Sequence, residues 1–114
     1  MEIAAEIEDM ETRALALSEL GVSYTFTNNL IEAKRNYLES YRLFQITGNF
    51  LRISLISNNL GKIFLNMFDY SSAIKYFEEG LQAAGTNKRS RILNLLGLGD
   101  AYSNLSNYSR ALNY

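Results

Sequence analysis

The chain has 114 residues, of which 47% are hydrophobic and 20% charged, and its net charge is −1. This balance is typical of one soluble folded domain and gives no general attraction to nucleic acid or an anionic membrane. Cysteine, histidine and proline are absent, which excludes disulfides and thiolate chemistry and allows long uninterrupted helices. No apolar run approaches the ~18 residues of a membrane span, and the start does not resemble a signal peptide. We therefore expect a cytoplasmic protein.

Hydrophobic residues recur every three or four positions along most of the chain, which is the period of an α-helix. No stretch alternates as a β-strand would, so the predicted fold class is all-α. The pattern predicts helices over residues 2–27, 30–46, 50–67, 70–84 and 88–104, and a sixth that begins at Tyr108 and is cut off at Tyr114.

Polar residues and glycines separate these segments. Asn29 with Glu32 resembles a capping box at the start of the second helix. Gly48 can adopt the left-handed conformation that ends a helix. Asp69 is a good N-cap for the fourth helix, and Asn107 is expected to cap the sixth.

A Leu-Gly pair followed by a spaced set of aromatic and small residues recurs along the chain. Leu60, Gly61, Phe64, Ala73 and Phe77 match Leu20, Gly21, Tyr24, Ala33 and Tyr37 at an offset of 40. Leu98, Gly99, Tyr102, Tyr108 and Ala111 match Leu60, Gly61, Phe64, Tyr70 and Ala73 at an offset of 38. A rival register for the third unit uses Leu96-Gly97, but it puts Asp100 at the buried aromatic position. We expect the glycines to be packing residues, each of which lies opposite the alanine of its partner helix.

These residues resemble the tetratricopeptide repeat family, whose signature has Leu-Gly-x-x-Tyr on one helix and Ala-x-x-x-Phe on the next. The resemblance covers units at 14–47, 54–87 and 92–114, the last one truncated. The spacing is close to that of the longer subclass, with units of about 40 rather than 34 residues. The aromatic that often begins the motif is replaced by Leu17, Ser57 and Leu95. The resemblance implies a right-handed α-solenoid of antiparallel helix hairpins, whose first helices line a concave groove.

The family's groove positions can be carried over to this chain residue by residue. They are Ser18, Val22, Thr25, Phe26, Asn58, Lys62, Leu65, Asn66, Leu96, Asp100, Ser103 and Asn104. The amides among them can donate and accept hydrogen bonds, which suits a peptide backbone. The alternative is that they are solvated polar residues on helix surfaces. The set does not match the chaperone-tail-binding type, because only Lys62 offers a positive charge.

Other candidate sites have simpler explanations. Glu78-Glu79 is expected to be a solvated surface rather than a carboxylate pair or a metal site. Lys88, Arg89 and Arg91 form a basic cluster that could contact an acidic partner but is too narrow for nucleic acid. The serines lack a plausible activating partner. The sequence therefore predicts a protein without an active site, cofactor or metal.

The favoured function is a non-catalytic scaffold that binds a protein or peptide in the concave groove. A second hypothesis is a sensory or regulatory segment of a larger signalling protein. A third is self-association, because a seven-residue sixth helix is too short to stand alone and no polar capping helix follows it. Either the chain is part of a longer protein, or its uncapped end pairs with another copy as a homodimer.

Overall fold

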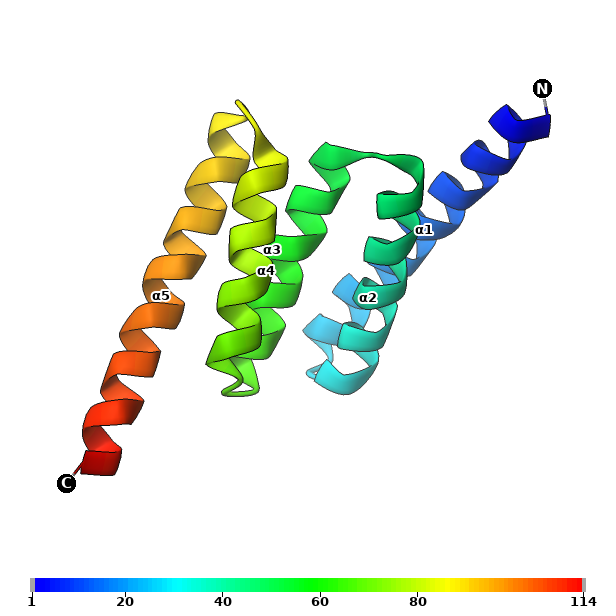
Figure 1. Cartoon of the computed structure of the whole chain (residues 1–114). Helices are drawn as coiled ribbons and strands as arrows, with labels where there is room; N and C mark the ends of the chain where they lie inside the picture. The colour runs from blue at the N-terminus through cyan, green and yellow to red at the C-terminus, as the bar shows by residue number, and fades with distance from the viewer. Residues whose placement is uncertain (1, 114) are drawn as a thin grey trace.

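The computed structural model describes residues 2–113, with the side chains of residues 2, 111 and 113 outside the description. The described residues form five α-helices and no strand. The helices are α1 (Glu2–Phe26), α2 (Leu30–Thr47), α3 (Phe50–Asn66), α4 (Tyr70–Ala84) and α5 (Lys88–Asn113). Successive helices run antiparallel and are arranged in series from the N- to the C-terminus (Figure 1). The predicted all-α class is confirmed, in an elongated array measuring 62 × 32 × 18 Å.

Within each hairpin, a glycine of the first helix lies against an aromatic ring of the second. A Cβ at Gly21 would lie 2.7 Å from the ring of Tyr37, and one at Gly61 would lie 2.5 Å from the ring of Phe77. Real Cβ atoms do not approach other atoms so closely, so only glycine allows these rings to touch the helix backbone. The predicted packing role of these two glycines is confirmed, but the nearest atoms belong to the rings of Tyr37 and Phe77 and not to the predicted alanines.

A buried serine hydroxyl further along each hairpin donates a hydrogen bond to a backbone carbonyl of the opposite helix. In the first hairpin Ser40 of α2 donates to the carbonyl of Ala14 at 2.6 Å. In the second hairpin the donor is Ser54 of α3 and the acceptor is the carbonyl of Gly80 at 2.7 Å. The two bonds join equivalent positions in opposite directions. Both hairpins therefore bring their backbones close together at a second point, where each hydroxyl is satisfied.

The third unit starts with α5, which packs on α4 through Gly97. A Cβ at Gly97 would overlap the ring of Phe77, whereas one at Gly99 would have no atom within 4 Å. The prediction that Gly99 contacts a neighbouring helix is therefore wrong for the described residues. The physical reason is that Gly97 faces the preceding helix α4, while Gly99 lies on the outward side of α5.

The predicted sixth helix is also wrong within the described residues. Helix α5 continues without a break from Lys88 to Asn113, through the expected cap Asn107. Extending an existing helix adds a hydrogen bond for each residue, whereas a seven-residue helix has to form its own costly first turn. The expected roles of Ala111 and Tyr114 concern a side chain and a residue that lie outside the described parts.

Side-chain caps begin three of the helices. Asn49, Asp69 and Asn87 accept hydrogen bonds from backbone N–H groups of the first turns of α3, α4 and α5, at 3.0–3.2 Å. Gly48 ends α2 with φ of 74°, in the predicted left-handed conformation. The predicted capping box at α2 is wrong: the side chain of Asn29 forms no cap hydrogen bond. The carboxylate of Glu32 instead pairs with Arg35 at 3.2 Å, on the next turn.

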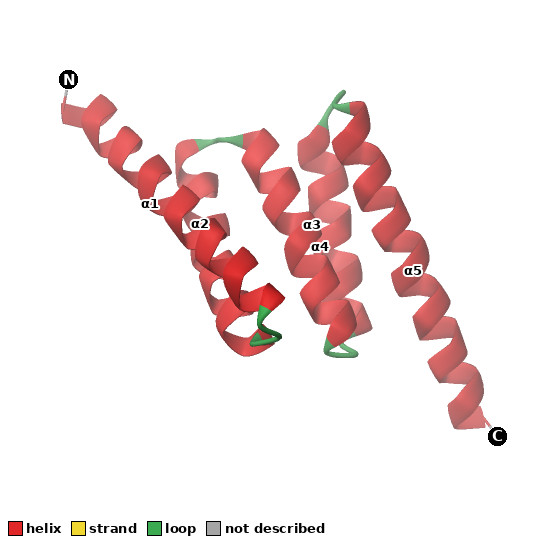
Figure 2. Ribbon diagram, turned by 180° about the vertical axis from the view of Figure 1, so that it is seen from behind, coloured by secondary structure: helices red, strands yellow, loops and turns green. Residues whose placement is uncertain are grey.

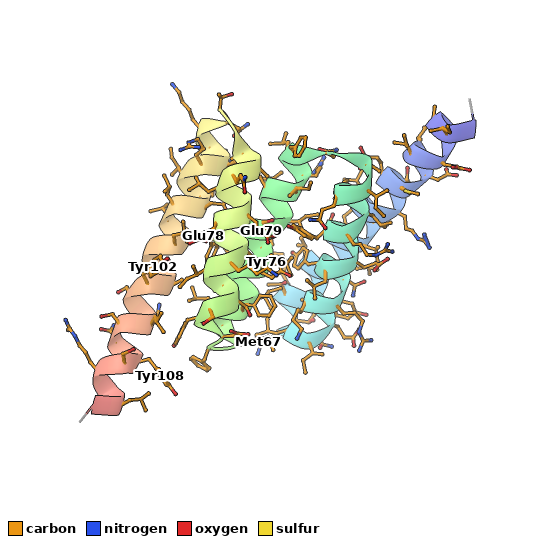
Figure 3. The ribbon with its side chains drawn as sticks, in the orientation of Figure 1. Met67, Tyr76, Glu78, Glu79, Tyr102 and Tyr108 are labelled. Carbon is orange, nitrogen blue, oxygen red and sulfur yellow. The ribbon has the colours of Figure 1, made fainter. Side chains whose placement is uncertain are left out.

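Tyrosines connect the two hairpins where α4 lies beside α2. The hydroxyl of Tyr41 on α2 donates to the carboxylate of Glu79 on α4. The rings of Tyr41 and Tyr76 meet edge to face, with their centroids 5.7 Å apart, and Tyr76 stacks on Phe64 at 5.4 Å. Figure 3 shows Tyr76 and Glu79 on the side of α4 that faces α2. The pKa of Tyr41 is raised mainly by burial and next by the hydrogen bond to Glu79. The pKa of Tyr76 is raised mainly by burial and next by the charge of Glu79.

The two glycines of α5 give a matched pair of substitutions. Gly97→Ala forces the Phe77 ring to move, and overpacking of this kind typically costs about 1–3 kcal/mol. Gly99→Ala meets open space and gains helix propensity of about 1 kcal/mol. We expect chemical denaturation to show lower stability for Gly97→Ala and equal or higher stability for Gly99→Ala. The opposite order would contradict the contact between Gly97 and Phe77.

The buried tyrosines predict that stability falls at alkaline pH. A pKa raised above the ordinary tyrosine value of 10.0 means that the unfolded chain releases the proton first. The stabilisation is then complete below pH 10.0 and is lost as the pH rises through the folded-state value. We expect the free energy of unfolding to decline more gently above this pH in Tyr41→Phe than in the wild type. Identical slopes in urea denaturation series would contradict this role of Tyr41.

Candidate functional site

A cleft of about 320 Å³ lies between α1 and α3, with one wall from α5. Figure 2 views the molecule from the side on which α1 and α3 lie in front of α2 and α4. The cleft is lined by Ser18 and Val22 of α1, by Arg52, Leu55, Ile56, Asn58, Asn59 and Lys62 of α3, and by Leu93 of α5. Helix α3 therefore supplies most of the lining. The structure brings four of the predicted groove residues together here: Ser18, Val22, Asn58 and Lys62.

The lining of the cleft combines apolar and polar side chains with positive charge. Leu55 is half-buried and Val22 is 41% exposed, so apolar groups are available to a bound chain. Arg52 and Lys62 are both exposed, and neither forms an ion pair with any described residue. No acidic side chain lines the cleft within the described part of the chain. This environment favours a ligand that carries both apolar and negatively charged groups.

Asn58 differs from its predicted role. Its side chain is only 4% exposed, and its amide donates to the side-chain oxygen of Asn94 on α5 at 3.4 Å. Asn94 in turn donates to the hydroxyl of Ser54 at 3.3 Å and to the carbonyl of Ser90 at 2.9 Å. The expectation that Asn58 offers a free amide to a peptide is therefore corrected. This amide is a buried link between α3 and α5, beside the cleft.

The other eight predicted groove residues do not line the cleft. Most of them are exposed, and Leu65 is half-buried against the cluster that contains Ala73 and Phe77. Thr25 donates its hydroxyl to the carbonyl of Gly21 at 2.7 Å, and Asn104 donates to the carbonyl of Asp100 at 2.7 Å. Those outside the cleft lining are Thr25, Phe26, Leu65, Asn66, Leu96, Asp100, Ser103 and Asn104. The structure gathers only part of the predicted groove into one cavity.

Sequence reasoning missed several residues that line the cleft. Arg52, Leu55 and Asn59 precede Lys62 on α3 at steps of three and four residues. This is the helical period, so they share a face with Lys62. Extending the predicted face of α3 back by this period would have found them. Leu93 of α5 had no such signal, because its place depends on how α5 packs against α3.

A second cleft, of about 450 Å³, lies between α2 and α4 over the start of α3. Its lining includes Tyr41, Phe50 and Glu79. The carboxylate of Glu79 already accepts a hydrogen bond from the hydroxyl of Tyr41, so it is less available to a ligand. The charged groups of the first cleft have no such partner among the described residues, so that cleft is the stronger candidate.

The fold and the two hairpins define an all-α helical-repeat protein. Residues 56–87, which include α4 and most of α3, match the family model of the tetratricopeptide repeat. The resemblance drawn from the sequence is confirmed for this segment, which lies in the middle one of the three predicted units. The longer subclass, with units of about 40 residues, stays a prediction. Comparisons with curated proteins and with solved structures gave no significant match.

Repeats of this family commonly act in protein–protein interaction. Among the described residues, no helix is long and apolar enough to cross a membrane. In the same part of the chain, no group of three or more acidic side chains is placed to hold a metal ion.

The cleft predicts different effects for its two central polar residues. Asn58→Ala leaves the buried side chain of Asn94 without its donor, and such a loss typically costs about 1–3 kcal/mol. Lys62→Ala removes an exposed side chain and should change stability by less than about 0.5 kcal/mol. Thermal and urea denaturation of the two variants will measure the difference. Equal stabilities would contradict the structural role of Asn58.

Proposed function

We propose that the chain is a non-catalytic scaffold that binds a protein through an extended peptide segment in the cleft between α1 and α3. The single observation that carries this proposal is an open cleft whose lining combines apolar and polar side chains with two cations, Arg52 and Lys62. The family's role in protein–protein interaction supports the same class of function.

The lining selects the chemistry of the peptide. Arg52 and Lys62 lie ten residues apart on α3, which separates them by about 15 Å along the helix axis. Leu55 and Asn59 lie between them on the same face. A ligand that satisfies this arrangement carries acidic groups at two points and an apolar side chain between them. The amide of Asn59 can donate and accept hydrogen bonds to its backbone.

Two further functions remain as hypotheses. One is a sensory or regulatory segment of a larger signalling protein, in which the cleft would also receive the partner. The other is self-association, which would use another surface. The expected location is cytoplasmic.

A library of 12-residue peptides with varied charge and hydrophobicity tests the proposed ligand. We expect acidic peptides with a central apolar residue to bind best by fluorescence polarisation, with an affinity that falls as salt is added. Arg52→Ala/Lys62→Ala should weaken this binding by about tenfold or more, which corresponds to about 1.4 kcal/mol.

The matched control is Arg35→Ala/Arg42→Ala, which removes the same charge from α2. It should change peptide binding by less than about twofold, because screening weakens charges that lie far from the ligand. An equal loss in the two double variants would indicate a nonspecific charge effect. That result, or a library without preference for acidic peptides, would refute the proposed ligand.

A further inference from the structure

The second cleft, between α2 and α4, carries a single negative charge. Among the described residues that line it, Tyr41 and Phe50 supply aromatic rings, Gln45 and Gln82 supply amides, and only Glu79 is charged at neutral pH. The ring of Phe50 is 67% exposed, and both glutamines are exposed as well. Helices α2 and α4 lie in front in Figure 1, whereas α1 and α3 lie in front in Figure 2. The two clefts therefore open on opposite faces and carry opposite charges.

The carboxylate of Glu79 has room for a second partner. Its Oε2 atom accepts the hydrogen bond from the hydroxyl of Tyr41, whereas its Oε1 atom has no hydrogen bond or ion pair to any described residue. Lys75 lies one turn earlier on α4, but its ammonium lies 5.2 Å from the centroid of the Tyr76 ring and forms no ion pair with Glu79. An ionised carboxylate offers about four lone-pair sites. A cation from outside can therefore bind Glu79 without displacing Tyr41.

The first hairpin shows the same carboxylate position with a cation of its own. Glu39 of α2 is equivalent to Glu79 at the repeat offset of 40. Its carboxylate pairs with Arg42 on the next turn, where the Nε atom of the arginine donates at 3.2 Å. The residue of α4 that is equivalent to Arg42 is Gln82, which is neutral and lines the cleft. Within the described part of the chain, Glu79 therefore lacks the guanidinium that its equivalent has.

We propose that the cleft between α2 and α4 binds an arginine side chain of a partner protein. The guanidinium pairs with the carboxylate of Glu79, and its planar face lies on the ring of Phe50, because arginine stacks on aromatic rings. The remaining N–H groups donate to the side-chain oxygens of Gln45 and Gln82. Lysine fits this set less well, since its ammonium has three donors and no planar face. The volume of about 450 Å³ is ample for one such side chain.

The position of Glu79 strengthens its attraction for a guanidinium. The residue is half-buried, and salt screens partly buried charges less than exposed ones. Tyr41 is a positioning residue, because its hydrogen bond holds the carboxylate between α2 and α4. The site takes the opposite charge to the one proposed for the cleft between α1 and α3 and lies on the other face of the array. Either site can therefore fail its test while the other stands.

An NMR titration with two matched pentapeptides tests the site. The probe is acetyl-Gly-Ser-Arg-Ser-Gly-amide, and its control carries citrulline, which has nearly the shape of arginine but no charge. The arginine peptide should shift the backbone amide signals of Gln45, Glu79 and Gln82 saturably below ~10 mM, a weak affinity because one side chain supplies the contact. The citrulline peptide should bind at least ~tenfold more weakly. Equal binding of the two peptides, or no shift at the cleft by ~10 mM, would overturn the proposal.

Three variants of α4 separate this site from a general charge effect. Glu79→Gln removes the charge but keeps an acceptor for Tyr41, so it should fold normally and bind the arginine peptide at least ~tenfold more weakly. Gln82→Arg changes an exposed residue and copies the pair of the first hairpin, so its own guanidinium should weaken binding similarly. The control Glu78→Gln removes the same charge on the α5 side of α4 (Figure 3) and should change binding less than ~twofold. Equal losses in Glu78→Gln and Glu79→Gln, or unchanged binding in Gln82→Arg, would refute the site.

Discussion

The arrangement of α3, α4 and α5 depends on the position of one side chain, the ring of Phe77. The ring is fully buried, and one edge of it lies against Gly61 of α3 and Gly97 of α5. Because neither glycine has a Cβ, the ring touches two helix backbones at once. Any larger residue at either position would separate one of the helices from α4. The contact therefore sets the distances among three helices and, with them, the directions in which the outer faces of α3 and α5 point.

This packing decides which residues of α3 remain available to a ligand. Gly61 and Ser54 face α4, and Asn58 is linked to Asn94 of α5. The side that is left carries Arg52 and Lys62 together with the residues between them. A buried amide pair stabilises helix packing only when both partners are present, because an unpaired buried amide is costly. Asn58 therefore fixes the wall of the cleft, and the neighbouring exposed residues define its chemistry.

The sequence predicted the helices well because their signals are local. Apolar periodicity and the caps at Asn49 and Asp69 act over one or two turns, and the Leu-Gly pairs fixed the hairpin contacts at Gly21 and Gly61. The errors arose where an outcome depends on the presence of a neighbour. Asn107 could have begun a sixth helix, but α5 continues through it to Asn113. Asn58 has the polarity of a surface residue, and only the packing of α5 shows that it is buried.

The two glycines of α5 show how one repeat motif can serve two purposes. Gly97 contacts the helix before it, and Gly99 lies at the position where the earlier units contact the helix after them. In α1 and α3 this second face is covered within the same hairpin, and the matching small residues Ala14 and Ser54 are buried. In α5 the equivalent position carries the larger Ile92, which is 56% exposed. Small residues at this level allow two helix backbones to approach closely, so the side chain of Ile92 would hold a helix packed on this face of α5 at a greater distance.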